Sequence, residues 1–460
     1  MGGLCGVVSN RNCLEDLLYG TDYHSHLGNS LAGIAVVSQK GCFQRSTHRI
    51  ANTSFRSKFE IYLREMEGKL GIGCISDGES QPLLVRSRLG SYAIAFVGRI
   101  NNIRELAEEV IQRSHFLEIS ENRINPVEIV AALIDQSDDF GSGIRTAQET
   151  IDGSCSLLVL IENELYAARD RFGRTPLIIG EKDGSFCVVS ETCALLNLGY
   201  KIERVLGPGE IVRITTDGVK QINSPGNTLK ICAFLWVYYG FPASSYEGIN
   251  VEEMRNRSGR ILAFNDNVAA DIVVGIPDSG LPYAIGYANQ SGIPLARALI
   301  KYTQSWQRSF MPDDADLRRL IAGMKLIPAR ELIENKRIVL CDDSIVRGTQ
   351  LRGIVQGLYD CGAREVHMRV ACPPIIYGCN FLNFSQSEIN DLVARHAINQ
   401  IGCDFSRCID STSEEYRQMV GFIRQIFGFS SLRYQTMEDM VRAIGLPKEN
   451  ICTYCWDGKG

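Results

Sequence analysis

Two adjacent carboxylates followed by a glycine-containing turn are the residues in this sequence that most clearly indicate a chemical function. Residues 336–352 read KRIVLCDDSIVRGTQLR: an apolar strand ends at Asp342 and Asp343, and residues 344–349 open a helix. Backbone amides at a helix N-terminus, with a flanking glycine and hydroxyls, form a cradle for an anion such as phosphate. Carboxylates would repel phosphate, so sugar hydroxyls or a bridging Mg²⁺ are their expected partners. The alternative is a capped strand-to-helix turn without a ligand.

A second chemical signal lies near the end of the sequence, where two residues separate Cys452 from Cys455. This spacing occurs in redox-active pairs, in metal sites and in unrelated thiols. Soft thiolates suit zinc and iron–sulfur clusters equally well. His24 and His26 would share one face of a strand, but no third metal ligand is evident, so surface or turn histidines are expected.

The composition excludes several classes of protein. The 460 residues are 45% hydrophobic and 22% charged with a net charge of -5, which predicts a folded protein rather than a disordered one. No basic run or long apolar stretch indicates binding to nucleic acid or a membrane. The N-terminal residues lack signal-peptide features, so we expect a cytoplasmic protein whose 16 cysteines are mostly reduced thiols.

The elements that must position these residues fall into two domains. Short predicted strands around two helices, 103–113 and 125–135, indicate an α+β first domain, with Asn125 as N-cap and Pro126 at the first helical position. Beyond a turn-rich passage at 207–226, predicted strands at 271–276, 337–341 and 365–371 alternate with helices at 281–290 and 351–360. This pattern predicts a parallel sheet with ligands at its carboxyl ends. We place the domains at 1–228 and 229–460.

The acidic segment resembles the phosphoribosyl pyrophosphate signature of type I phosphoribosyltransferases. Residues 274–280 (VGIPDSG), 301–312 with Arg308, and 324–326 with Lys325 resemble the corresponding segments of glutamine phosphoribosylpyrophosphate amidotransferases, and similarity to that family extends over nearly the whole chain. The resemblance implies that Asp342, Asp343 and Ser279 hold the ribose and Mg²⁺, and that Arg308 and Lys325 contact pyrophosphate from a mobile loop. The implied cradle for the 5-phosphate is Ser344, Ile345, Val346, Arg347, Gly348 and Thr349.

Two departures affect this half of the chain. Gln350 replaces the usual second threonine after the loop glycine, and Thr303 replaces an arginine that is usual just after Lys301. The second departure would weaken binding of an anion.

The same resemblance implies a metal cluster bound by four of the cysteines. Cys232 and Cys379 lie in segments similar to those of the family members that carry a cluster, and with Cys452 and Cys455 they are the implied ligands of a [4Fe-4S] cluster. Only the resemblance favours iron over zinc. The other twelve cysteines are expected to be buried, small hydrophobic residues.

Cys5 resembles the N-terminal nucleophile of class II glutamine amidotransferases, whose free α-amine acts as the general base. That role requires removal of residues 1–4. The family's pocket residues are altered: Leu27 and Ser76 replace arginines, an aspartate falls near Pro126, and Val97 replaces the oxyanion-hole asparagine, although Gly98 remains. Val97 cannot donate to an oxyanion, a loss of roughly 2.7 to 4 kcal/mol. The glutaminase is therefore expected to be retained as a fold and impaired as a catalyst.

The resemblance implies an N-terminal nucleophile, four-layer αββα sandwich followed by a type I phosphoribosyltransferase domain. The implied reaction converts phosphoribosyl pyrophosphate and glutamine or ammonia into 5-phosphoribosylamine and pyrophosphate, the first step of purine synthesis. A homo-oligomer with purine nucleotide feedback inhibitors is expected. The alternatives are a paralogue that binds phosphoribosyl pyrophosphate or nucleotide for regulation, and transfer of the phosphoribosyl group to another amine.

Overall fold

The structure is a computed structural model that describes residues 2–28, 30–38, 40–51, 53–113, 117, 119–120, 123–302, 326–382 and 391–459. It divides into two compact units. The N-terminal unit comprises residues 1–232, 243–248 and 379–384, and the C-terminal unit comprises 233–242, 249–378 and 385–460. The two short segments that join the N-terminal unit from later in the sequence were not expected.

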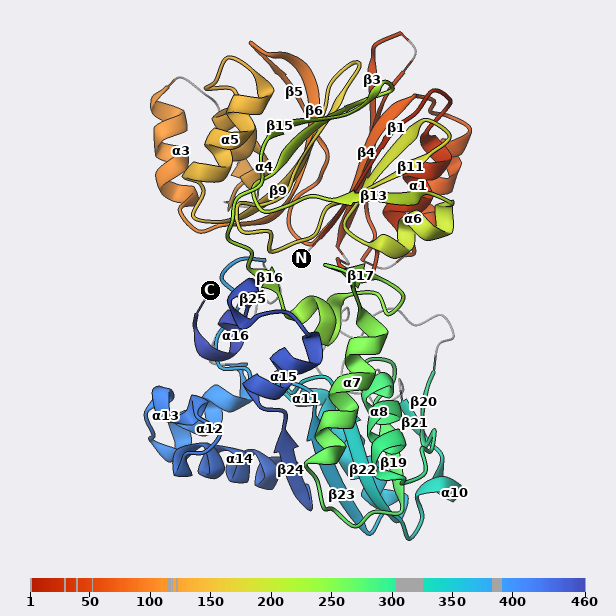
Figure 1. The fold of residues 1–460 in the computed structure, drawn as a ribbon, viewed down its shortest axis with the longest axis vertical. Coiled ribbons are helices and arrows are strands. Elements are labelled where there is room, and N and C mark those ends of the chain that lie inside the picture. The colour runs from red at the N-terminus through yellow and green to blue at the C-terminus, as the bar shows by residue number, and fades with distance from the viewer. Residues whose placement is uncertain are drawn as a thin grey trace. The chain divides into compact units, whose positions relative to one another are not determined.

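Two antiparallel sheets form the centre of the N-terminal unit (Figure 1). The first contains, in spatial order, β13 (Lys201–Val205), β11 (Ile178–Lys182), β12 (Ser185–Val189), β1 (Gly3–Val8), β4 (Leu70–Ser76), β2 (Leu31–Val37) and β3 (Phe43–Arg49). The second contains β15 (Gly218–Asn223), β14 (Ile211–Thr215), β10 (Leu165–Ala168), β9 (Gly153–Leu160), β6 (Gly90–Ile100) and β5 (Leu83–Ser87). A small hairpin pairs β7 (Ile119–Ser120) with β8 (Arg123–Ile124), and β16 (Ile231–Cys232) and β17 (Ser245–Tyr246) are short.

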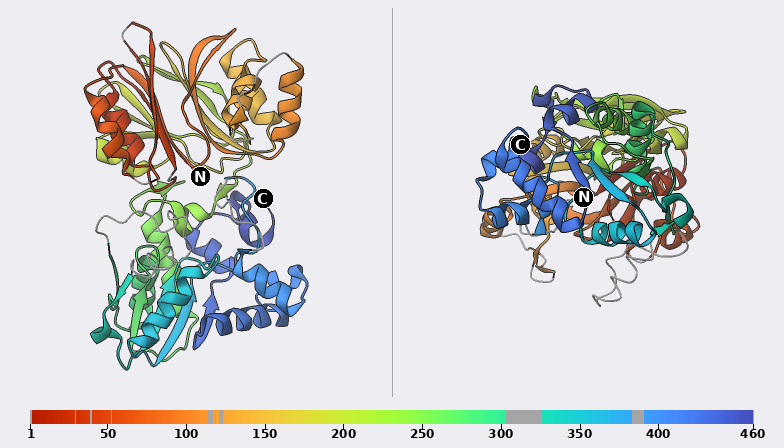
Figure 2. Two further views of the ribbon diagram at one scale, coloured as in Figure 1. Left: turned by 180° about the vertical axis from the view of Figure 1, so that it is seen from behind. Right: turned by 90° about the horizontal axis from the view of Figure 1, so that it is seen from below.

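Helices cover the outer face of each sheet, as the rear view in Figure 2 also shows. One side carries α1 (Leu14–Asp22), α2 (Phe55–Phe59), the 3₁₀ turn η1 (Glu60–Leu63) and α6 (Thr192–Leu198); the other carries α3 (Ile103–Gln112), α4 (Pro126–Ile134) and α5 (Phe140–Thr150). Successive strand residues face opposite layers. Leu4 of β1 lies in the core between the sheets, whereas Cys5 lies in the core under α1. The predicted αββα sandwich is thus confirmed.

The predicted capping of α4 is confirmed in detail. Asn125 precedes the helix in an extended conformation, and its side-chain oxygen accepts a hydrogen bond from the Val127 amide at 3.0 Å. Pro126 occupies the first turn, where its missing N–H costs no helical hydrogen bond.

A parallel four-stranded sheet organises the C-terminal unit. Its order is β19 (Ile272–Gly275), β22 (Arg337–Asp342), β23 (Glu365–Val370) and β24 (Ser431–Tyr434). Helix α8 (Leu281–Ser291) packs on β19 and β22, and α7 (Val251–Phe264) packs on α8. The further elements are η2 (Leu235–Tyr239), β18 (Ile249–Asn250), β20 (Leu299–Lys301), β21 (Leu326–Pro328), α10 (Arg330–Ile333), α11 (Thr349–Asp360), α12 (Val393–Ile401), α13 (Phe405–Ile409), α14 (Glu414–Phe427), α15 (Met437–Ile444), η4 (Lys448–Asn450), β25 (Ile451–Cys452) and α16 (Tyr454–Asp457). The predicted parallel sheet is confirmed.

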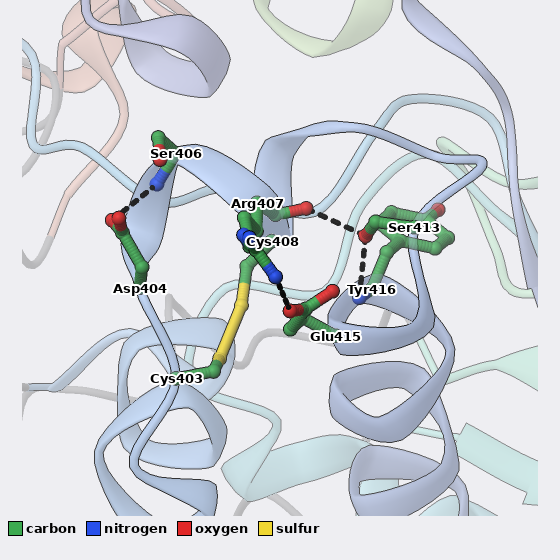
Figure 3. Close-up of a disulfide and its surroundings, with 8 residues drawn as sticks. All are labelled: Cys403, Asp404, Ser406, Arg407, Cys408, Ser413, Glu415 and Tyr416. Atoms are coloured by element: carbon green, nitrogen blue, oxygen red, sulfur yellow. Dashed lines mark hydrogen bonds and ion pairs between the residues drawn. A yellow bond between two sulfur atoms is a disulfide. The ribbon is translucent and has the colours of Figure 1, made fainter.

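One pair of cysteines departs from the expected reduced, buried thiols. Cys403, just after α12, forms a disulfide with Cys408 in α13 (Figure 3). The neighbouring turn is held by Ser413, whose hydroxyl donates to the Arg407 carbonyl at 2.6 Å, and by the Arg407–Glu415 ion pair at 2.7 Å. Cys42, which is exposed, and Cys361, which is half-buried, are also exceptions.

Within the described ranges, no helix combines the length and apolar character needed to cross a membrane.

Candidate active site

The acidic pair lies where two parallel strands end at the same edge of the C-terminal sheet. β22 pairs with β19 in parallel, with Gly275 opposite Cys341, and the Ile276 amide donates to the Cys341 carbonyl at 3.0 Å. The chain leaving β19 therefore runs beside the chain leaving β22. This brings Ser279 to the acidic pair, because its hydroxyl donates to Asp342 Oδ1 at 3.5 Å. Ser279 and Asp342 lie far apart in the sequence, and the parallel pairing of β19 with β22 brings them together.

The two carboxylates are held close together in a poorly solvated position. The Asp343 amide donates to Asp342 Oδ1 at 2.9 Å, and the Ser344 hydroxyl donates to Asp343 Oδ2. Burial and the neighbouring Asp343 carboxylate raise the pKa of Asp342 well above its ordinary value, and burial also raises the pKa of Asp343. Two adjacent carboxylates, one half-buried and one buried, are disfavoured without a compensating cation. The oxygen donor set and this unsatisfied charge fit a hard divalent cation such as Mg²⁺.

The turn after the acidic pair leads directly into α11. Ile345 is buried and anchors the turn, whereas Arg347 lies outside and pairs with Asp391 at 3.3 Å. Gly348 caps the helix in the left-handed region, with φ of 70°, and Thr349 begins the helix. Ser344 and Val346 complete the predicted cradle, so its residues are contiguous at the carboxyl edge of the sheet. Gln350 is exposed in the first turn of α11.

The predicted pyrophosphate contacts are only partly described. Arg308, Lys325 and the Thr303 departure lie outside the described residues. Lys301 is the last residue of β20, and its ammonium pairs with Asp278 at 2.5 Å in the loop after β19. The Pro277–Asp278 peptide bond in that loop is cis.

The four predicted cluster ligands are divided between the units. Cys232 and Cys379 belong to the N-terminal unit, and Cys452 and Cys455 belong to the C-terminal unit. All four side chains are buried, with 5 to 9% of their surface exposed. The Leu382 amide donates to Cys379 Sγ at 3.3 Å. The described part of the chain shows no group of three or more His, Cys, Asp or Glu side chains arranged to hold a metal ion, so the structure does not establish a cluster.

Cys5 occupies the interior of a sheet rather than a chain end. It pairs with Gly73 of β4 on one side and Val189 of β12 on the other, and its side chain is fully buried. Its nitrogen is the amide linked to Leu4, which is itself held by Ser190: the Leu4 amide donates to Ser190 Oγ at 3.3 Å, and the Ser190 amide donates to the Leu4 carbonyl at 3.2 Å. A thiol without solvent and without an adjacent amine cannot act as the predicted nucleophile in this form of the chain.

Of the four altered glutaminase positions, Leu27, Ser76 and Val97 are buried, whereas Pro126 is half-buried. Leu27 is 3% exposed, Ser76 8% and Val97 6%. Val97 lies beside Gly2, because a Cβ built on Gly2 would lie 3.2 Å from Val97 Cγ2. Gly98 has φ of 154°, and any Cβ there would overlap the backbone of β9. Val97 therefore places a methyl group, not an amide donor, next to the segment that precedes Cys5.

His24 lies in a turn, which was one of the two expected placements, but its side chain is fully buried rather than at the surface. Its Nδ1 lies 2.8 Å from the Gly20 carbonyl, and its Nε2 accepts from the Ser190 amide at 3.0 Å and the Glu191 amide at 3.1 Å. Burial lowers the pKa of His24 to about 4, so the ring is neutral. His26 is partly exposed and binds Glu191 Oε1 at 2.9 Å.

Sequence reasoning did not predict that the Tyr246 hydroxyl contacts this turn. Tyr246 donates its hydroxyl to Glu191 Oε1 at 2.8 Å, so His26 and Tyr246 share one buried carboxylate. No spacing in the sequence indicates this contact, because Tyr246 lies far along the chain and joins the N-terminal unit through a short segment. Through these contacts, Glu191 and Tyr246 hold the turn that follows α1.

Comparison with known proteins agrees with both units. A model of the glutamine amidotransferase domain matches residues 68–197, and a model of the phosphoribosyl transferase domain matches residues 256–375. The amidophosphoribosyltransferase of Methanocaldococcus jannaschii is 32% identical, and the match covers 100% of this chain and 97% of the relative. The Bacillus subtilis relative is 30% identical over 99% of this chain and 93% of its own.

Solved structures give the same answer. The glutamine phosphoribosylpyrophosphate amidotransferase of B. subtilis, in a complex with ADP and GMP, superposes with a TM-score of 0.86 and 30% identity. The match covers 99% of this chain and 96% of that structure. With similarity of this extent in sequence and in fold, the chain belongs to the amidophosphoribosyltransferase family.

Proposed function

We propose that the chain converts phosphoribosyl pyrophosphate and an amine donor, ammonia or glutamine, into 5-phosphoribosylamine and pyrophosphate, the first step of purine synthesis. Family membership supports a pentosyltransferase reaction. The observation that carries the proposal is the carboxylate pair of half-buried Asp342 and buried Asp343, joined by Ser279 at the carboxyl edge of a parallel sheet and followed by the glycine turn into α11.

The chemistry gives each proposed residue a task. The bond from ribose C1 to pyrophosphate breaks, a bond from C1 to nitrogen forms, and the amine loses a proton. Asp342 and Asp343 would orient the ribose, while residues 344–349 hold the 5-phosphate through backbone amides. Bound Mg²⁺ would supply charge neutralisation for the leaving pyrophosphate. We assign Arg308 and Lys325 to the same pyrophosphate, on the family resemblance alone.

The nitrogen donor is the finer part of the proposal. Ammonia is favoured over glutamine because Cys5 is buried and joined to Leu4, and because Val97 offers no hydrogen bond to an oxyanion. Leu27 and Ser76 provide no cation for the glutamine carboxylate. Removal of residues 1–4 would expose the Cys5 amine, so the mature N-terminus decides how far the glutaminase is impaired.

A steady-state assay tests the proposal directly. Pyrophosphate release should require both phosphoribosyl pyrophosphate and Mg²⁺, should proceed with ammonium, and should be lost in Asp342→Asn. Ammonium-dependent turnover retained by Asp342→Asn would refute the assignment of the site. Glutamine-dependent turnover abolished by Cys5→Ala would refute the preference for ammonia. Binding of phosphoribosyl pyrophosphate without turnover would instead support the regulatory alternative, and turnover with a different amine only would support the third.

We also propose that Cys232, Cys379, Cys452 and Cys455 are the ligands of a structural [4Fe-4S] cluster. Their burial and the amide hydrogen bond to Cys379 Sγ are compatible with thiolate ligands. Protein purified without oxygen should be brown and contain about four irons per chain, and Cys455→Ser should remove both. Cys361→Ser is the matched control, because Cys361 is a free thiol at the end of α11. Colourless protein with one zinc would refute the iron assignment.

Regulation and assembly complete the proposal. The related B. subtilis structure holds ADP and GMP, which supports purine nucleotides as feedback inhibitors. A homo-oligomer and a cytoplasmic location are proposed on the same family grounds. Inhibition of the ammonia-dependent reaction by purine nucleotides, and the mass measured by light scattering, test the first two points.

A further inference from the structure

The loop that would hold the 5-phosphate contacts the helical segment between β23 and β24. The amide of Val393, the first residue of α12, donates to the Val346 carbonyl at 2.8 Å, and Asp391 pairs with Arg347 at 3.3 Å. Figure 1 shows α12, α13 and α14 as one group of blue helices beside β24. Two consecutive residues of the loop are thus fixed from outside the strand–turn–helix motif that the sequence signature covers.

The closest support comes from the end of α14. Gly348 is left-handed, and a Cβ built on it would overlap the Phe427 ring. Phe427 is 6% exposed and continues the buried stripe of α14, after Met419 and Ile423. The next residue back, Ile426, accepts a hydrogen bond through its carbonyl from the Arg352 guanidinium at 3.3 Å. Phe427 therefore fills the space directly against the backbone of Gly348.

We propose that Phe427 is a positioning residue for the phosphate loop, and that the ring fixes the backbone of Gly348 and the first turn of α11. This role rests on the proposed function, because it concerns the binding of phosphoribosyl pyrophosphate. A cradle of backbone amides binds phosphate only when its donors converge on one point, and a displacement of about 1 Å at a distance from the chemistry is enough to cost up to about 100-fold. Truncation of the ring would leave a cavity into which Gly348 relaxes.

Phe429 supplies a matched control. It is 4% exposed, and its ring centroid lies 5.6 Å from that of Phe427, in the same cluster. Phe429 lies past Gly428, which ends α14, and it is not among the atoms nearest to Gly348. Phe429→Ala should therefore remove comparable packing without releasing the loop.

Steady-state kinetics and calorimetry on the full chain test the role. Phe427→Ala should raise KM and Kd for phosphoribosyl pyrophosphate about tenfold or more, with a smaller change in kcat, because the loop binds but does not react. Phe427→Leu should restore most of the affinity. Phe429→Ala should lower the melting temperature but change KM less than about twofold, because Phe429 is not among the groups nearest to Gly348.

The outcomes separate the role from the proposed function. Wild-type protein that binds phosphoribosyl pyrophosphate, with Phe427→Ala binding equally well, would overturn the positioning role alone. Equal losses of affinity in Phe427→Ala and Phe429→Ala would also overturn it, because they would indicate general destabilisation. Wild-type protein that binds no phosphoribosyl pyrophosphate in the presence of Mg²⁺ would overturn the proposed function itself.

Discussion

Asp343→Asn is expected to make the protein more stable and inactive at the same time. Asp343 is 4% exposed beside a second carboxylate, and its raised pKa shows that the folded protein disfavours its charge. Asparagine keeps an oxygen that can accept the Ser344 hydroxyl, while it removes the negative charge. Single stabilising substitutions commonly add about 0.5 to 2 kcal/mol, and we expect a gain of this size here. For a unit of about 150 to 250 residues, 1 kcal/mol corresponds to about 2 to 4 °C in melting temperature.

The pH dependence follows from the direction of the pKa shift. Because the folded pKa of Asp343 lies above the unfolded value, the folded state binds the proton more tightly than the unfolded chain does. The charge of Asp343 therefore costs stability above the raised pKa, and this cost disappears as the pH falls toward the unfolded value. The gain from Asp343→Asn should be full above the raised pKa and should shrink as the solution is acidified toward the unfolded value.

Calorimetric scans with and without Mg²⁺ and phosphoribosyl pyrophosphate provide the assay. Without them, Asp343→Asn should melt above wild type. With ligand at about 100 times its Kd, wild type should gain about 2.7 kcal/mol and Asp343→Asn should gain little, so the order of melting temperatures should reverse. Asp360→Asn, at the exposed end of α11, is the control and should change neither scan. A variant less stable than wild type without ligand would refute the reasoning, because the carboxylates would then be compensated by the protein itself.

Four further changes test other parts of the structure. Arg369→Met should lower the free energy of unfolding, measured in urea, by about 3 to 5 kcal/mol, because it removes the guanidinium that pairs with the buried Asp266 carboxylate. Gly98→Ala should cost about 1 to 3 kcal/mol by the same measurement, because its φ of 154° disfavours a side chain. Leu27→Arg should cost about 3 kcal/mol, since Leu27 is 3% exposed, whereas Leu27→Met should be nearly neutral. Thiol titration of the denatured, unreduced chain should count 14 of the 16 cysteines, and a count of 16 would contradict the disulfide between α12 and α13.

The elements of both units could be predicted because their signals are local. The apolar strand before Asp342 and the helix beginning at Thr349 follow from a few neighbouring residues. Asn125 is a helix cap for the same reason.

The features that sequence reasoning missed depend on distant contacts. The burial of His24 follows from Ser190 and Glu191, whose amides both donate to its ring. The spacing of His24 and His26 in the sequence does not indicate that the His24 side chain is buried. Phe427 is similar, because its spacing in α14 predicts only a buried position, and the contact with Gly348 arises from the packing of α14 against the loop.

The two units differ in whether their candidate functional residues carry an energetic cost that a bound ligand would relieve. This difference supports a competent transferase joined to an impaired glutaminase. Asp342 and Asp343 are adjacent carboxylates, half-buried and buried respectively, whose pKa values are raised, so the folded chain bears a cost that a bound cation would relieve. Such a cost is expected of a site that still binds a ligand. The glutaminase half shows no corresponding cost at Leu27 and Val97, where apolar side chains fill buried positions. A pocket that still received glutamine would need a cation there for the carboxylate and a donor for the oxyanion. If Leu27→Arg proved harmless, the position would be open to water, and the case for an impaired pocket would lose its physical basis.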